Sequence, residues 1–273
     1  MDIFAEIIEN FHFKMERPVS YGWFHLLFLG LTVLITVLLC VTHKREDTKR
    51  VRTVVLIISV IVALLEVYKQ ITYTFHIEDG MIVKDFQWYA FPFQFCSMPM
   101  YVGLLAGITK GKLHDCLCAF LATYSVFAGI CVMVYPNDVF TELAGVSIQS
   151  MICHGTMIVL GVYLLYTGYV KAEHKTMLRA LPVFSAAVAL AAIMNEVVYR
   201  TNIAGGETFN MFFISPHFEG TLPVYSSVQA VVPFPWCLFI YIAVFTLASY
   251  VLLLMAMGIK KLVTGIQKKA ELA

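Results

Sequence analysis

Seven long apolar stretches limit what this chain can fold into. Each spans roughly 19 to 25 residues, and about 20 apolar residues allow a helix to cross a hydrocarbon core of about 30 Å. Only 14% of the 273 residues are charged, against about 25% in ordinary soluble domains. We therefore expect an all-α membrane protein, a single bundle of about seven transmembrane helices. The stretches lie at about 21–42, 51–75, 91–109, 113–134, 149–170, 176–198 and 233–258.

The distribution of Lys and Arg predicts the orientation of the bundle. Fourteen of these residues fall on one set of alternate connections and four on the other. Because Lys and Arg are enriched in cytoplasmic loops, we expect the N-terminus outside and the C-terminus in the cytoplasm. An odd number of spans agrees with that orientation.

The short gaps between the stretches favour one polytopic membrane domain over residues 1–273. The segment 1–18 lacks the apolar region and cleavage site of a signal peptide. Four apolar residues between Phe4 and Phe11 share one helical face, which predicts a helix lying along the membrane interface. The connection 199–232 is too long and too aromatic for a simple turn. We expect it outside the bundle, as a lid over a polar site or as an interfacial segment.

Charge and cysteine usage exclude several classes of protein. The net charge of +1 and the absence of a basic patch interleaved with aromatics give no sign of nucleic-acid binding. All seven cysteines fall in or beside the apolar stretches, so a disulfide framework is not expected. Cys116 and Cys118 lack zinc-ligand spacing, and no P-loop, Rossmann or HExxH pattern occurs. We expect no metal and no other cofactor.

Polar and ionisable residues collect at one level of the expected bundle. Cys96 and His154 each lie about five residues into their spans, which places them roughly 7 Å below the outer boundary. Ionisable groups at membrane depth cost a few kcal/mol unless they face the bundle interior or water, so they mark a candidate functional site. The others at this level are Glu66, Lys69, Gln70, Asn195 and Glu196.

Cys96 and His154 are the candidate catalytic pair. A lone cysteine in a span is more often a packing residue, but Pro99 leaves the carbonyl of Phe95 without a helical donor beside this thiol, and a nearby helix N-terminus favours a thiolate. An imidazole at matching depth is a suitable general base for a thiol. His154 on its own could equally be a buried residue that donates to a carbonyl. We expect Cys153 to be a packing residue.

The charged residues of the second and sixth spans are spaced for local neutralisation. Glu66 and Lys69 are three residues apart and share a helix face with Gln70. They could orient the histidine, bind a phosphate-bearing head group or form an internal ion pair. Glu196 and Arg200 have the i, i+4 spacing of a helical ion pair.

Two side-chain amides at the same level each allow two interpretations. Gln94 and Asn195 could donate to an oxyanion that develops during a reaction. They could equally hold helices together by interhelical hydrogen bonds.

Four motifs occur in a distinctive order: FPFQFCSMPMYVGLL, ICHGTMIVLGVYLL, NEVVYRTNIAGGETFNMFF and VPFPWCLFIYI. On these motifs the chain resembles, over nearly its whole length, the YwaF-like family of integral membrane proteins. That family includes eukaryotic transmembrane relatives regarded as phospholipid acyltransferases, in which a cysteine and a histidine carry catalysis. The resemblance maps these roles onto Cys96 and His154. It implies a multi-pass protein of the bacterial plasma membrane whose substrate is a phospholipid or another acyl-lipid.

These observations support two hypotheses of different classes. The first is a membrane-embedded acyltransferase that acts on phospholipid or lysophospholipid acyl chains through a Cys/His thioacyl mechanism; with water as the acceptor, the same site would be a lipid hydrolase. The second is a non-enzymatic carrier or receptor that binds an amphipathic small molecule in an outward-facing polar cavity. We prefer the enzyme, because the sequence shows neither the internal repeat nor the midplane site common in transporters.

Overall fold

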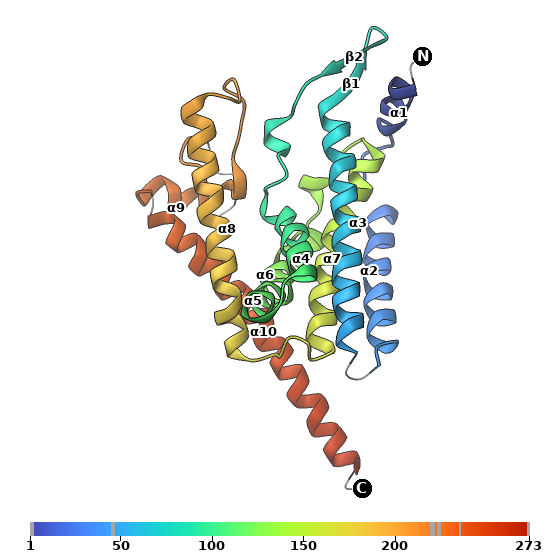
Figure 1. Ribbon diagram of the computed structural model, residues 1–273, viewed down its shortest axis with the longest axis vertical. Helices are drawn as coiled ribbons and strands as arrows, with labels where there is room; N and C mark the ends of the chain where they lie inside the picture. Colours follow the sequence, from blue (N-terminus) through green and yellow to red (C-terminus); the bar gives the residue numbers. More distant parts are fainter. Residues whose placement is uncertain (1–2, 45–46, 219–221, 223–224, 235, 272–273) are drawn as a thin grey trace.

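The structure, a computed structural model, describes residues 3–44, 47–218, 222, 225–234 and 236–271. In this part of the chain, six helical segments are long and apolar enough to cross a membrane, and Figure 1 shows them assembled into one bundle. The expected all-α membrane fold is confirmed. The six segments are α2 (Trp23–Val41), α3 (Thr48–Thr74), α5 and α6 together (Gly111–Ala122 and Tyr124–Val134), α7 (Ala144–Tyr166), α8 (His174–Thr201) and α10 (Trp236–Glu271).

The expected span 91–109 is wrong in its first half. Only α4 (Met98–Ile108) is α-helical there, and it follows two short 3₁₀ turns, η1 (Trp88–Ala90) and η2 (Phe95–Ser97). Pro99 stands in the first turn of α4, where its missing N–H is tolerated. It therefore begins the helix and does not loosen a helix that already contains Cys96, which was the sequence-based interpretation.

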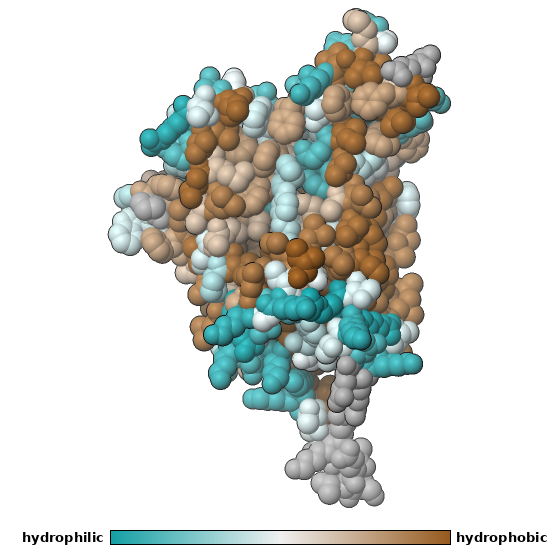
Figure 2. Space-filling view, viewed as in Figure 1, coloured by the Kyte–Doolittle hydropathy of each residue, from teal (hydrophilic) through white to brown (hydrophobic). Residues whose placement is uncertain are grey.

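The two ends of the bundle differ in structure. At one end β1 (Phe75–Glu78) and β2 (Met81–Lys84) form an antiparallel hairpin, and α1 (Ile3–Phe11) lies beside it. We call this the hairpin end. The opposite end carries the connections rich in Lys and Arg and the C-terminus; Figure 2 shows hydrophilic side chains gathered near it, with apolar surface above them. We call it the basic end.

Close helix contacts are made at glycines. A Cβ added to Gly103 of α4 would lie 2.0 Å from the Ser59 Oγ of α3, and one added to Gly107 would lie 2.8 Å from a carbon of Leu56. Two small residues four positions apart allow the helix backbones to approach closely in a membrane. These contacts hold α4 close against α3. Because Cys96 lies immediately before α4, they also set its position.

The connection after α8 does not lie wholly outside the bundle. Its central part, which includes η4 (Met211–Phe213), is inserted among the helices: Phe209, Phe212 and Ile214 are at most 1% exposed. A short helix, α9 (Tyr225–Val231), leads back to α10. Residues 219–221 and 223–224 of the expected lid region lie outside the described residues.

Candidate functional site

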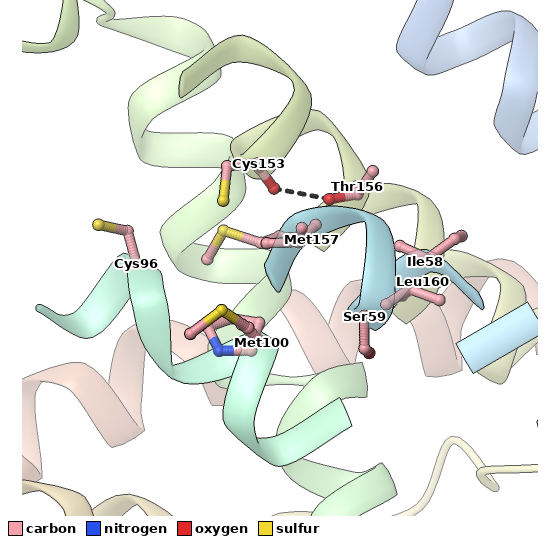
Figure 3. Close-up of a pocket in the computed structure, with 10 residues that line it drawn as sticks. Ile58, Ser59, Cys96, Met100, Cys153, Thr156, Met157 and Leu160 are labelled. Carbon is pink, nitrogen blue, oxygen red and sulfur yellow. Dashed lines mark hydrogen bonds between the residues drawn. The ribbon is translucent and has the colours of Figure 1, made fainter. Parts of the chain in front are cut away.

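Cys96 lines a small cavity inside the bundle. It lies in η2, immediately before α4, and the cavity has a volume of about 10 Å³. That is about the space one water molecule needs. Figure 3 shows Cys96 and Met100 on one side, with Cys153 and Met157 of α7 on the other, and the sulfur of Cys96 points away from the other labelled residues.

His154 does not line this cavity, although its neighbour Cys153 does. Adjacent residues of a helix point about 100° apart, so only one of the two can face Cys96 directly. The Nδ1 atom of His154 lies 2.7 Å from the Ser150 carbonyl oxygen, and its Nε2 atom is buried without a hydrogen-bond partner among the described residues. Of the expected pair, only Cys96 is therefore among the residues that line the cavity.

The helix that carries His154 begins earlier than expected. The helix α7 begins at Ala144, five residues before the expected start, so His154 is its eleventh residue, about 15 Å from the helix start at 1.5 Å per residue. Cys96 shares a cavity with Ser59, near the middle of α3.

A buried polar network stands beside this cavity. The Glu66 carboxylate is 2.8 Å from the Lys69 ammonium, 2.9 Å from the Gln70 side-chain nitrogen and 3.3 Å from that of Gln149. Gln70 also donates to the carbonyl of Ala90, at 2.7 Å. Every strong charge in the network therefore has a partner, as burial at membrane depth requires.

Lys69 interacts electrostatically with both candidate catalytic side chains, Cys96 and His154. Sequence analysis did not include Gln149 in this group, because it stood at the edge of the expected span 149–170. The residue is in fact 3% exposed, within α7.

Gln94 and Asn195 both bind the backbone of the inserted connection. Gln94 donates to the carbonyl of Asn210 at 3.0 Å and accepts from the N–H of Phe212 at 2.9 Å. Asn195 donates to the carbonyl of Met211 at 3.0 Å and accepts from the N–H of the same residue at 2.7 Å. Asn195 of α8 and Gln94, the extended residue before η2, thus both join the inserted connection to the rest of the bundle.

Those four bonds hold an unfavourable backbone conformation in place. Phe212 and Phe213 have φ angles of +58° and +57°, a left-handed conformation that is costly for bulky residues. Asn210 adds a bond of 2.9 Å from the N–H of Ser215 to its side-chain oxygen. The sequence gave no basis for predicting this arrangement, because side-chain amides and backbone that are far apart in the chain make it.

Glu196 and Arg200 do not join the network around Glu66. The Arg200 Nε atom is 2.5 Å from the Glu196 carboxylate, and the His217 Nε2 atom is 2.7 Å from its second oxygen. The ring of His217 also stacks on Tyr199, with centroids 3.5 Å apart. Sequence analysis missed His217, which lies in the connection 21 residues after Glu196. This cluster ties the connection to the C-terminal part of α8.

A second, larger hollow lies between α3 and the chain from Pro92 to Leu104. Its volume is about 430 Å³, and it is lined mainly by apolar side chains, with Glu66 and Gln70 as polar members. Met100 lines both this groove and the cavity of Cys96. Among the described residues, no group of three or more His, Cys, Asp or Glu side chains could hold a metal ion.

Comparison with known proteins places the whole bundle in one family. Searches with the sequence return no matching curated protein and no matching solved structure. The profile of the TMEM164 family matches residues 20–254, from the residues just before α2 to the apolar part of α10. This match covers the candidate site, five of the six long helices in the described part of the chain and the first part of α10, and the chain therefore belongs to the TMEM164 family of transmembrane proteins.

Proposed function

We propose that this multi-pass membrane protein is an acyltransferase that acts on phospholipid or lysophospholipid acyl chains, with Cys96 as nucleophile and His154 as general base. The observation that carries the proposal is the placement of two residues: Cys96 lines an internal cavity immediately before α4, and the neighbouring helix α7 carries the buried His154 Nε2, which has no hydrogen-bond partner among the described residues.

The reaction would proceed in two half-reactions. In the first, the Cys96 thiol gives its proton to His154 Nε2, and the sulfur attacks the acyl carbonyl. The acyl–oxygen bond breaks, and the leaving alkoxide takes the proton from the imidazole, so that a thioester remains. In the second, an acceptor hydroxyl loses its proton to His154 and attacks the thioester, and the thiolate that leaves is protonated again.

The proposal requires His154 Nε2 to reach the sulfur, either through one water molecule in the cavity or after a change of side-chain rotamer. Gln94 and Asn195 are positioning residues in this scheme, since an oxyanion role would require them to release the inserted connection. We further propose that the hairpin end faces outward and that the protein resides in a bacterial plasma membrane, with bilayer phospholipids as partners.

The proposal is tested by labelling purified protein with an alkyne-tagged acyl donor. We expect labelling that hydroxylamine removes, because hydroxylamine cleaves thioesters. Cys96→Ser should abolish it, and His154→Ala should lower its rate by about 100-fold, within the usual range for general base catalysis. Cys153→Ser is the matched control, since this thiol lines the same cavity, and it should retain labelling. Persistent labelling of Cys96→Ser would exclude the assigned nucleophile.

A non-enzymatic carrier or receptor is the second candidate, and the groove of about 430 Å³ is the observation that favours it. A binding protein of this kind would retain lipid without forming a thioester. A lipid hydrolase would form the thioester but release free fatty acid when no lysophospholipid is supplied. The same labelling assay, followed by analysis of the products, separates the three activities.

A further inference from the structure

The groove between α3 and α4 follows the hairpin-end half of a membrane span. One wall extends from Ala63 of α3 to Phe75, where β1 begins, about 18 Å at a rise of 1.5 Å per residue. One leaflet of a bilayer contributes about half of the 30 Å hydrocarbon core. The groove therefore matches the length over which an acyl chain of one leaflet lies beside a protein.

Exposed apolar side chains in and beside the groove favour a lipid chain as its occupant. Val67 lines the groove and is 55% exposed, and Leu64 and Leu105 beside it are 65% and 48% exposed. Apolar side chains this exposed on a membrane helix face hydrocarbon. A partner helix about 10 Å in diameter would occupy about 1,400 Å³ over the same 18 Å, several times the groove volume. A flexible hydrocarbon chain can fill such a space, whereas a helix could insert only some of its side chains.

A cation stands at the mouth of the groove. Phe75 lines the groove at its hairpin end and is paired directly with Lys84 across the hairpin. Side chains directly opposite in an antiparallel pair project from the same face, about 5 Å apart. Lys84 is exposed, and within the described part of the chain no ion pair involves it. Its ammonium is thus available to a phosphate at head-group level.

From these observations we infer that the groove binds one acyl chain of a glycerophospholipid whose phosphate lies against Lys84. Met100 forms the wall between this chain and the cavity of Cys96. That the bound lipid is a substrate rests on the proposed function, but the binding itself does not require any chemistry at Cys96.

The test is photo-crosslinking of the full chain in lipid nanodiscs that contain a phospholipid with a diazirine in one acyl chain. We expect labelled peptides from 63–75 and 98–108 to exceed those from α2 by about fivefold, the effect of roughly 1 kcal/mol of binding free energy. Uniform labelling around the bundle would overturn the inference.

Substitutions in and beside the groove provide matched controls. Ala63→Phe and Val67→Trp both fill the groove and should lower its labelling by about fivefold, while Leu64→Phe, on the neighbouring lipid face, should leave it unchanged. Lys84→Glu should lower labelling and Lys84→Arg should preserve it. Equal effects of Ala63→Phe and Leu64→Phe, in protein of unchanged thermal stability, would overturn the inference.

Failure of this inference and failure of the proposed function are distinguishable. Cys96→Ser should retain photo-labelling of the groove, because the thiol takes no part in binding. Thioester formation without selective photo-labelling would refute the groove alone. Photo-labelling without a thioester in the wild-type protein would support the groove and refute the acyltransferase.

Discussion

At the scale of single residues, the candidate site is defined by which polar groups have partners and which do not. Glu66, Lys69, Gln70 and Gln149 satisfy one another inside the bundle. His154 Nε2, by contrast, is buried without a partner among the described residues. An unpaired buried nitrogen costs about 1–3 kcal/mol, so it marks a group that is kept available at the expense of stability.

Glu66→Gln should destabilise the protein more than it impairs its chemistry. The substitution leaves the Lys69 ammonium, whose side chain is only 16% exposed, without its counter-charge. Loss of one partner of a buried pair costs about 3 kcal/mol. We expect a lower thermal unfolding temperature in detergent, and Lys69→Met added to Glu66→Gln should restore part of it. An unchanged unfolding temperature for Glu66→Gln would show that the pair is not stabilising.

At the scale of elements, three segments position Cys96. The helix α4 is anchored to α3 through Gly103 and Gly107, the turn η2 presents Cys96, and the inserted connection packs beside that turn. The stacked rings of Phe95 and Phe212, with centroids 5.7 Å apart, join the last two. Cys96 is therefore held in place by the packing of α4, which follows it in the chain, and by the inserted connection, which packs beside η2.

Gly103→Leu should separate α3 from α4. Even the first carbon of the new side chain would overlap Ser59 Oγ, and overpacking of this kind costs about 1–3 kcal/mol or more. Gly30→Leu in α2 is the control, since no atom lies within 4 Å of its added Cβ. Thermal unfolding should distinguish the two variants clearly; similar unfolding temperatures would contradict the close α3–α4 contact.

Gln94→Ala should release the inserted connection. It removes two hydrogen bonds to the backbone of 210–212 and leaves buried polar groups unpaired, at a cost of about 1–3 kcal/mol. Hydrogen exchange of the amides in 209–215 should accelerate, whereas Gln87→Ala, at a partly exposed glutamine whose side chain bonds Asp85, should have no effect there. Unchanged exchange in Gln94→Ala would mean that the amide does not hold the connection.

At the scale of the whole molecule, hydropathy predicted the all-helical bundle, because bilayer thickness fixes the length of a span. It could not predict the half-length α4, since prolines and an extended chain replaced the first turns of an apolar stretch. The hairpin was predictable from Asp79 and Gly80, a pair typical of a tight turn. The cavity of Cys96 was not, because contacts across three helices determine which of the two neighbours, Cys153 or His154, lines that cavity.

The orientation of the bundle is also a property of the whole molecule. If the hairpin end faces outward, a protease site inserted at Gly80 should be cleaved in intact cells. The same site inserted at Gly111, at the basic end, should be protected until the membrane is opened. Both glycines have positive φ and open surroundings, so the insertions should be tolerated equally. The reverse pattern of cleavage would invert the proposed topology.

The most direct measurement is the mass of the peptide that contains Cys96 after brief incubation of the full chain with a long-chain acyl donor. The account predicts an added acyl group on that peptide, lost with hydroxylamine and transferred to lysophospholipid when this acceptor is supplied. An unmodified Cys96 peptide under conditions in which the protein turns over the donor, or an acyl group found on Cys153 instead, would contradict it.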